Sequence, residues 1–295
     1  IAVVGSGPAG LAAASTAASR GHAVTLYEAA DRIGGQLTVA REIPGKQEFD
    51  ETMRYFAHEL DRHGVDVRTG ARVGVAELVD AAYDEVILAT GVTPRIPEID
   101  GLDHPKVLGY LDVLRDKAPV GQRVAVLGAG GIGFDVAEFL TDSGADPTDV
   151  DDFLRVWGID PEHRTPGGLA EPVRETPPRE VTLMQRKDSK LGAGLGKTTG
   201  WIHRTELKNR GVRFVAGVTY DRVDDAGLHF RIGETEHVID VDNVVLCTGQ
   251  ESERTLLDAL LDAGVSTHLI GGADVAAELD AKRAIDQGTR LAASL

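Results

Sequence analysis

Cysteine is almost absent from this chain, because Cys247 is the only one among 295 residues. The chain can therefore form no internal disulfide, no CxxC redox pair and no cysteine-ligated cluster. Aromatic residues make up only 5%, and no apolar run reaches the length needed to span a membrane. The low cysteine content is compatible with a cytoplasmic protein.

Positive charge is also scarce, with 31 basic residues against 47 acidic ones and a formal net charge of -16. This balance argues against a partner surface made of nucleic acid or anionic membrane. The ordinary alternative is that the acidic excess simply solvates the surface of a soluble protein. The nine histidines form no metal-ligand spacing and no nucleophile dyad, so we expect neither a metal site nor a catalytic side chain.

Length and glycine content favour two domains, because 295 residues with 35 glycines suit two units of about 150 residues each. The chain begins at Ile1 directly in an apolar run typical of a buried parallel strand. A chain seldom starts inside its first strand. We therefore expect it to be the C-terminal piece of a longer protein.

The sequence contains an internal repeat. Each copy has a short apolar run, three glycines and an Ala-rich or apolar stretch, which predicts strand, tight turn and helix. Each copy then has a glycine-flanked strand segment and closes with an apolar strand ending in Thr-Gly. The matching segments are IAVVGSGPAG and VAVLGAGGIG, HGVDVRTG and RGVRFVAG, and EVILATG and NVVLCTG.

The spacing of the repeat locates an insertion in its second copy. The glycine motifs begin at Gly5 and Gly128, 123 positions apart, whereas the closing glycines Gly91 and Gly249 lie 158 apart. The second copy therefore carries about 35 extra residues. We place them at about 143–178, which is rich in Pro, Asp and Gly, and expect a short helix within DVDDFLRVWGI.

The 46 residues after Gly249 belong to neither copy, and they contain a predicted strand, THLIGGADV, and a terminal helix from about Asp280. The segment HPKVLGYLDVLRDKA is predicted to be a connecting helix. We expect an α/β fold with two Rossmann-type three-layer domains, the second inserted in the first. The predicted boundaries are 1–104 with 250–295 for one domain and 105–249 for the other.

The first glycine loop has the features of a dinucleotide-binding turn. The glycines permit a tight turn and close approach of the backbone to a pyrophosphate at the helix N-terminus. Glu28 ends the next strand, 23 residues after the first glycine, where a carboxylate accepts hydrogen bonds from ribose hydroxyls. Simple helix–strand packing is the alternative. The predicted cofactor-binding residues here are Gly5, Gly7, Pro8, Ala9, Gly10 and Glu28.

The second loop has the same glycines but a different strand end, where basic residues replace the acid. An acid would repel a ribose 2'-phosphate, whereas Arg binds it with two hydrogen bonds, so the pattern favours NADPH over NADH. A solvated basic patch is the alternative. The predicted residues are Gly128, Gly130, Gly131, Ile132, Gly133, Arg186, Lys187 and Lys190.

One apparent motif is rejected. The run LGAGLGKTTG resembles a phosphate-binding P-loop, but the position that requires glycine is Leu191. A glycine-rich loop lining the dinucleotide site is the better interpretation.

Weaker candidates complete the site. Gly34 and Gly35 follow Glu28 as a cofactor loop would, although a buried turn explains them nearly as well. Asp274 follows the strand THLIGG, where a carboxylate can bind ribityl hydroxyls or act as a helix N-cap. The closing glycines of the two copies are also predicted to contact cofactors, whereas Cys247 is predicted to be a packing residue.

The arrangement of these motifs resembles the disulfide-reductase flavoprotein superfamily. This resemblance implies FAD in the first domain and NAD(P)H in the second. The redox CxxC or CxxxxC of its best-known members is absent here, so the electron acceptor must differ.

Longer stretches resemble the C-terminal half of bacterial NADPH-dependent 2,4-dienoyl-CoA reductases over essentially the whole chain. Among them are IPGKQEFDETMRYF, GGIGFDVAEFL, QRKDSKLGAGLGKTTGWIHR and LIGGADVAAELDAKRAIDQGTRLA. That family has an N-terminal (β/α)8 barrel with FMN and a four-cysteine segment for a 4Fe-4S cluster. Both would be partners of this chain. The resemblance assigns Gly35, Gln36 and Asp274 to the FAD half, beside the first glycine loop and Glu28.

Two functions follow from the sequence. The favoured one is an electron-transfer module that passes hydride from NADPH to FAD, since the cofactors themselves supply that chemistry. The other is a non-catalytic ADP-binding or nucleotide-binding module, as in trimethylamine-dehydrogenase-like flavoenzymes.

Overall fold

The computed structural model describes residues 1–144, 148–174, 176–277 and 280–295, and it divides the chain into two compact units. Unit 1 comprises Ile1–Arg41, Glu48–Arg95 and Gln250–Leu295, and unit 2 comprises Glu42–Gln47 and Ile96–Gly249. The first division after the N-terminal unit thus lies at 95/96 rather than at the predicted 104/105. In addition, the six residues 42–47 belong to unit 2, which the sequence did not suggest.

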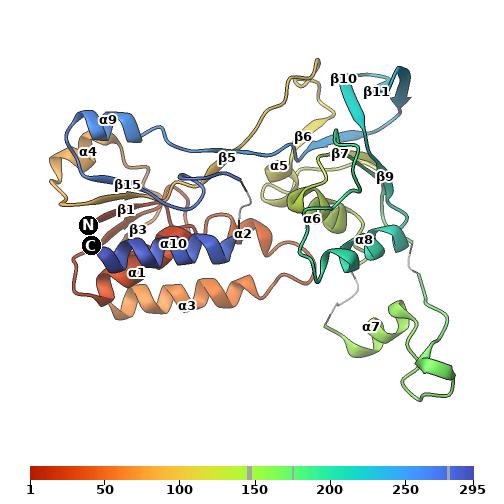
Figure 1. The fold of residues 1–295 in the computed structure, drawn as a ribbon, viewed down its shortest axis with the longest axis horizontal. Helices are drawn as coiled ribbons and strands as arrows, with labels where there is room; N and C mark the ends of the chain where they lie inside the picture. Colours follow the sequence, from red (N-terminus) through yellow and green to blue (C-terminus); the bar gives the residue numbers. More distant parts are fainter. Residues whose placement is uncertain (145–147, 175, 278–279) are drawn as a thin grey trace. The chain divides into compact units, whose positions relative to one another are not determined.

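Unit 1 is built on a five-stranded parallel sheet (Figure 1). Its order is β15 (Thr267–Leu269), β4 (Val86–Leu88), β1 (Ala2–Val4), β2 (Thr25–Tyr27) and β3 (Asp66–Arg68). A separate antiparallel pair joins β5 (Val92–Pro94) to β14 (Gln250–Ser252). The strand predicted in THLIGGADV is therefore confirmed at Thr267–Leu269, which form an edge strand of this sheet although they follow unit 2 in the chain, whereas residues 271–274 form a turn.

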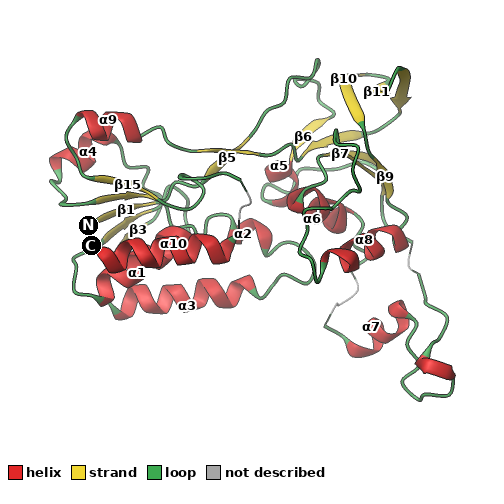
Figure 2. Cartoon of the chain, in the orientation of Figure 1, coloured by secondary structure: helices red, strands yellow, loops and turns green. Residues whose placement is uncertain are grey.

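Helices cover both faces of the unit 1 sheet, as Figures 1 and 2 show. One face packs against α1 (Pro8–Ser19), α3 (Phe49–Arg62) and α10 (Ala281–Ser294), and the other against α4 (Val75–Asp80) and α9 (Leu257–Asp262). A short helix, α2 (Leu37–Ala40), precedes α3. The terminal helix predicted from about Asp280 is confirmed, with Asp280 as its N-cap.

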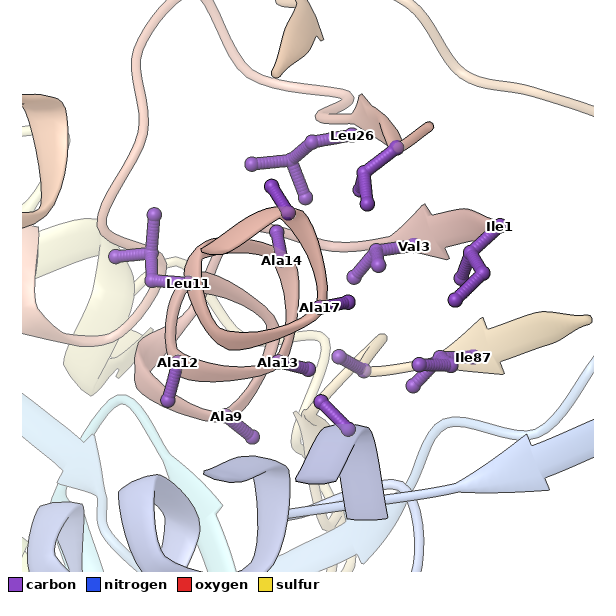
Figure 3. Packing of buried hydrophobic residues seen from close by; sticks show 14 of the residues in the cluster. Ile1, Val3, Ala9, Leu11, Ala12, Ala13, Ala14, Ala17, Leu26 and Ile87 are labelled. Carbon is purple, nitrogen blue, oxygen red and sulfur yellow. The ribbon is translucent and has the colours of Figure 1, made fainter. Parts of the chain in front are cut away.

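The core of unit 1 centres on α1, whose sequence PAGLAAASTAAS begins with Pro8 at the first helical position. Its alanines pack against the strands, and Ala17 points toward Val3 (Figure 3). Because these side chains are small, α10 lies close to α1: a Cβ added to Gly288 would overlap the carbonyl oxygen of Ala9. The Ala-rich composition therefore serves close helix packing.

Unit 2 has an equivalent five-stranded parallel sheet. Its order is β6 (Val107–Gly109), β13 (Asn243–Leu246), β7 (Arg123–Leu127), β8 (Glu180–Met184) and β9 (Arg213–Val215). On one face lie α5 (Tyr110–Leu114), α6 (Gly131–Leu140) and α8 (Gly200–Asn209). The other face packs against an antiparallel sheet of β10 (Val218–Asp224), β11 (Gly227–Ile232) and β12 (Thr235–Ile239).

One sequence prediction in unit 2 is wrong. The segment 104–118, predicted as a single connecting helix, forms strand β6 followed by the short helix α5. All three residues of β6 pair with β13. The last of them, Gly109, is also the N-cap of α5, and its N–H donates to Asp112 Oδ2 at 2.7 Å. Sheet pairing overrode a local pattern that suited a helix.

The second copy of the repeat contains the extra segment between α6 and β8. The short helix predicted within DVDDFLRVWGI is confirmed as α7 (Val150–Trp157), and a 3₁₀ turn follows at Pro166–Gly168. Asp149 caps α7 by accepting a hydrogen bond from Asp152 N at 3.0 Å. Within the described residues, no helix is long and apolar enough to cross a membrane.

Candidate functional site

The first glycine loop follows β1 in unit 1, and each glycine has a separate structural reason. Gly5 has a φ of +102°, and an added Cβ there would overlap the carbonyl oxygen of Ala89 at the end of β4. A Cβ on Gly10 would overlap the carbonyl oxygen of Gly5, so Gly10 permits α1 to pack on the turn. A Cβ on Gly7 would meet nothing within 4 Å. The loop thus leaves open space at the N-terminus of α1, which fits a pyrophosphate.

The second glycine loop, after β7 in unit 2, reproduces this geometry. Gly128 has a φ of +110° and faces the carbonyl oxygen of Cys247, and a Cβ on Gly133 would overlap the carbonyl oxygen of Gly128. Gly130 and Gly131 have open space within 4 Å. The sequence repeat is therefore also a repeat of atomic contacts, and the residues of this loop also fit a pyrophosphate.

Both loops lie where the strand order of their sheet reverses. In unit 1, β1 lies between β2 and β4, and in unit 2, β7 lies between β8 and β13. Connections on opposite sides of this point diverge and leave a crevice at the carboxyl ends of the strands, where ligands bind in doubly wound sheets.

Glu28 lies directly after β2 and is half-buried beside the first glycine loop. Its Oε2 accepts two hydrogen bonds from Ser6, one from the backbone N at 2.9 Å and one from Oγ at 2.6 Å, and its Oε1 accepts one from Ala30 N at 2.8 Å. The carboxylate therefore fixes the glycine loop as well as facing it. Ser6 is fully buried. It was not identified from the sequence as a site residue, because it occupies a variable position of the glycine motif.

The loop after Glu28 approaches the first glycine loop closely. Gly34 N donates to Ser6 O at 2.9 Å, and Gly34 itself is buried, since an added Cβ would lie 2.5 Å from Met53 Sδ. Gly35 has a φ of +52°, and an added Cβ would lie 2.8 Å from Gly7 Cα. Gly34 thus serves a buried turn, whereas Gly35 lets this loop reach the edge of the open space. Gln36 follows as the N-cap of α2.

The loop that carries Asp274 lies beside the closing glycine of the first copy. A Cβ on Gly272 would lie 3.1 Å from the carbonyl carbon of Gly91, which has a φ of +76°. The residue that caps α10 is Asp280, whose Oδ1 accepts from Lys282 N at 2.9 Å. The N-cap interpretation of Asp274 is therefore wrong, and its Oδ2 accepts instead from Gln287 Nε2 at 2.7 Å.

The basic residues of unit 2 lie directly after β8. Arg186, Lys187 and Lys190 are exposed, and none of them forms an ion pair within the described part of the chain. The turn itself is ordered, because Gln185 Nε2 and Gly217 N donate to the carbonyl oxygen of Lys187 at 3.0 and 3.1 Å. Three unpaired cations thus lie at the carboxyl end of the strand next to β7. The other closing glycine, Gly249, has a φ of +111° and is exposed.

The glycine-rich run that resembles a P-loop packs against the start of α6. A Cβ on Gly192 would lie 2.7 Å from Phe134 Cζ, and the carbonyl oxygen of Gly192 accepts a hydrogen bond from Arg204 Nη1 at 2.9 Å. Phe134 directly follows Gly133 of the second glycine loop. The run is therefore close to that loop, as a lining segment would be.

A charged cluster on α6 and α8 was not found from the sequence. Asp135 Oδ1 accepts from Lys46 Nζ at 2.6 Å, and Glu138 Oε1 contacts His203 Nδ1 at 2.6 Å. Burial raises the pKa of Asp135, and Lys46 opposes that rise. The hydrogen bond with Glu138 raises the pKa of His203. Lys46 lies in the segment 42–47, so its ion pair holds that segment to unit 2.

We expect Lys46→Met to lower the free energy of unfolding by about 1–3 kcal/mol, between the values for exposed and for fully buried pairs. The side chains of Lys46 and Asp135 are 30% and 21% exposed. The folded-state pKa of Asp135 is already raised, and losing Lys46 raises it further. The deficit should therefore grow as pH rises through the folded-state pKa of Asp135 and shrink below it, where the carboxyl is protonated in both the folded wild type and the folded variant.

Urea unfolding of wild type and variant across pH measures this difference. Arg54→Met is the matched control, because it breaks an Arg54–Glu51 pair whose side chains are 66% and 67% exposed. It should leave the free energy of unfolding almost unchanged at every pH, because an exposed pair contributes little. A Lys46→Met deficit that does not depend on pH contradicts the assigned role of Asp135.

Two further observations limit the chemistry of the chain. Within the described residues, no three His, Cys, Asp or Glu side chains cluster as a metal site requires. Cys247 is buried at the end of β13, and burial raises the pKa of its thiol. A raised pKa disfavours the nucleophilic thiolate, which agrees with a packing role.

These features define a class of protein with two Rossmann-type dinucleotide-binding units, the second inserted in the first, each with an open glycine loop at its switch point. The model of the pyridine nucleotide-disulphide oxidoreductase family matches residues 1–282. The chain belongs to this family, and membership implies FAD and a pyridine nucleotide as cofactors. The resemblance to two-dinucleotide-domain flavoproteins is thereby confirmed.

Known proteins similar to this chain include longer ones. A metal reductase from Desulforamulus reducens is 27% identical over 277 residues, which cover 92% of this chain and 41% of the reductase. The structure of 2-naphthoyl-CoA reductase has a TM-score of 0.82 at 23% identity and covers 100% of this chain and 39% of its own. Thioredoxin reductase from T. acidophilum has a TM-score of 0.68 at 16% identity, covering 100% and 96%. The chain thus spans about two fifths of the first two proteins.

Proposed function

We propose that this chain is the FAD- and NADPH-binding reductase module of a larger flavoenzyme of the 2,4-dienoyl-CoA reductase type. The observation that carries the proposal is the pair of open glycine loops with opposite charge beside them. Glu28 lies beside the loop of unit 1, and three unpaired cations follow the neighbouring strand in unit 2. A carboxylate suits ribose hydroxyls, and cations suit a 2'-phosphate.

The residues of the chain bind and orient rather than transfer protons. The bound cofactors supply hydride transfer between a nicotinamide and a flavin, which needs no general base. Ser6 and Glu28 fix the first loop, and Gly35 brings the following loop to it. Asp274 provides a carboxylate on the turn whose Gly272 lies beside Gly91. Arg186, Lys187 and Lys190 attract the 2'-phosphate and so select NADPH.

The partners in this proposal are a barrel domain with FMN and a segment with a 4Fe-4S cluster, which precede this module in the protein. They would receive electrons from FAD and deliver them to an acyl-CoA in a cytoplasmic fatty-acid pathway. Support comes from the long sequence stretches that resemble 2,4-dienoyl-CoA reductases and from the larger size of the similar proteins. The domain assignment follows: unit 1 holds FAD and unit 2 holds NADPH.

We expect the purified chain to carry flavin that absorbs at about 450 nm and that NADPH bleaches under anaerobic conditions. Ferricyanide or a small quinone should then reoxidise it, whereas a dienoyl-CoA should not, because the chain lacks cluster ligands. Stopped-flow absorbance at the flavin band, with each acceptor added in turn, measures this. Steady turnover of a dienoyl-CoA by this chain contradicts the proposal that the chain is only the reductase module of a larger enzyme. Bound FAD that NADPH does not reduce favours a nucleotide-binding module without catalysis.

A further inference from the structure

The turn Gly271–Asp274 joins β15 to the segment before α10, and side chains from elsewhere in unit 1 hold its backbone. Ser252 Oγ donates to Gly272 O at 2.7 Å, and Arg254 Nε donates to Ala273 O at 2.6 Å. Arg254 Nη2 also donates to Asp274 O. Three successive carbonyl oxygens of the turn therefore accept side-chain hydrogen bonds, which fix the backbone conformation from which the Asp274 side chain projects.

Gln287 on α10 connects the two ends of this turn. Its Oε1 accepts a hydrogen bond from Gly271 N at 2.8 Å, and its Nε2 donates to Asp274 Oδ2 at 2.7 Å. A backbone N–H can only donate and an ionised carboxylate can only accept, so this is the one amide orientation that satisfies both partners. Gln287 thereby occupies Oδ2 of Asp274. No described residue donates to Oδ1.

The helix that carries Gln287 is itself closely fixed. The next residue, Gly288, lies so near α1 that an added Cβ would overlap the carbonyl oxygen of Ala9. Gly271 has a φ of +64°, and an added Cβ there would lie 2.8 Å from Ala9 Cβ. Both Gly271 and Gly288 are thus packed on Ala9, which follows Pro8 in the first glycine loop. These contacts fix the backbone of α10 beside Gln287 relative to that loop.

We propose that Gln287 is a positioning residue for flavin binding, an inference that rests on the proposed function of unit 1. By holding Oδ2 of Asp274, the amide turns Oδ1 toward a hydroxyl group of the ribityl chain of FAD. A carboxylate that is oriented before the ligand arrives loses less conformational entropy on binding. Gln287 acts through Asp274.

Gln287→Glu tests this role because a glutamate retains the acceptor but loses the donor when it is ionised. Two carboxylates then face each other, which raises their apparent pKa values and forces Asp274 out of position. We expect FAD to bind roughly tenfold more weakly at about pH 8.5 and to recover to within about twofold of wild type at about pH 6, where the pair holds a proton. Gln287→Met should bind FAD roughly tenfold more weakly at both pH values, because it can neither donate nor accept.

Quenching of flavin fluorescence during titration of apoprotein with FAD measures the affinity without any turnover. Gln122→Glu is the matched control, because it makes the same chemical change at an exposed position in unit 2, directly before β7. It should bind FAD as wild type does at both pH values. A merely structural role for Gln287 would weaken binding in Gln287→Glu equally at both pH values, and that result overturns the inference.

Glu28→Ala separates this inference from the proposed function. Glu28 interacts with the first glycine loop and makes no contact with the turn that Gln287 holds. If Glu28→Ala loses FAD while Gln287→Glu binds it like wild type at both pH values, only the role of Gln287 is overturned. If the wild-type apoprotein binds no FAD, the proposed function of unit 1 is overturned, together with the inference.

Discussion

Replacing Gly133 with valine should slow the reduction of bound flavin by NADPH about 10–100-fold while FAD stays bound. A Cβ at this position would overlap the carbonyl oxygen of Gly128, so α6 must move away from the turn that would hold the pyrophosphate. Overpacking of this kind costs about 1–3 kcal/mol, and about 1.4 kcal/mol corresponds to a factor of ten. Anaerobic stopped-flow absorbance at the flavin band measures the rate, and dithionite shows that the flavin remains reducible.

The equivalent change in unit 1 should weaken the binding of FAD instead of the reaction with NADPH. A Cβ on Gly10 would overlap the carbonyl oxygen of Gly5, so Gly10→Val should lose FAD on dialysis. Gly74→Val is the control for both, because its φ is −105° and an added Cβ meets nothing within 4 Å. If NADPH reduces Gly133→Val at the wild-type rate, the assignment of the nucleotide to unit 2 is wrong.

Replacing Arg186 with glutamate should lower kcat/KM for NADPH by about a hundredfold or more and change that for NADH far less. The substitution puts a negative charge where an attractive one is proposed to meet the 2'-phosphate, and opposed like charges at a binding site cost several kcal/mol. NADH lacks this phosphate, so it loses only the weaker, longer-range attraction. The initial rate of flavin reduction with each nucleotide gives the ratio.

The control for this prediction is Arg213→Glu. Arg213 is exposed at the amino end of β9, whereas Arg186 follows the carboxyl end of β8, so the two positions lie at opposite ends of neighbouring parallel strands. The change in net charge is the same. Equal losses for NADPH and NADH in Arg186→Glu would show that Arg186 has a role other than recognising the phosphate.

The glycine loops were predictable because their constraints are local. A φ near +100° at Gly5 and Gly128 and a helix that packs back on the turn require particular residues at fixed spacing. The following strand must end beside the loop in a parallel sheet, and this explains why Glu28 could be placed from its distance along the chain. The repeat added a second, independent example of the same pattern.

Other parts of the site depend on pairs that are distant in sequence. Ser6 reaches Glu28 across 22 positions, and Lys46 reaches Asp135 across 89. The role of Gln287 could not be predicted for the same reason. Its position on α10 is typical of an ordinary helix surface, and only the fold brings the turn after β15 beside it. Strand β6 was predicted as helix for a related reason, because its partner strand β13 lies more than a hundred residues away in the sequence.

The position of α10 and β15 in the chain has a consequence for the order in which the protein folds during synthesis. All five parallel strands of unit 2 lie between residues 107 and 246, so its sheet can form as soon as that stretch leaves the ribosome. Unit 1 begins earlier in the chain but cannot be completed until β15 and α10 are synthesised. Until then the face of α1 that packs against Gly288 is exposed to solvent. That face is made largely of alanine, whose single methyl groups expose little apolar surface to aggregation before α10 packs on them.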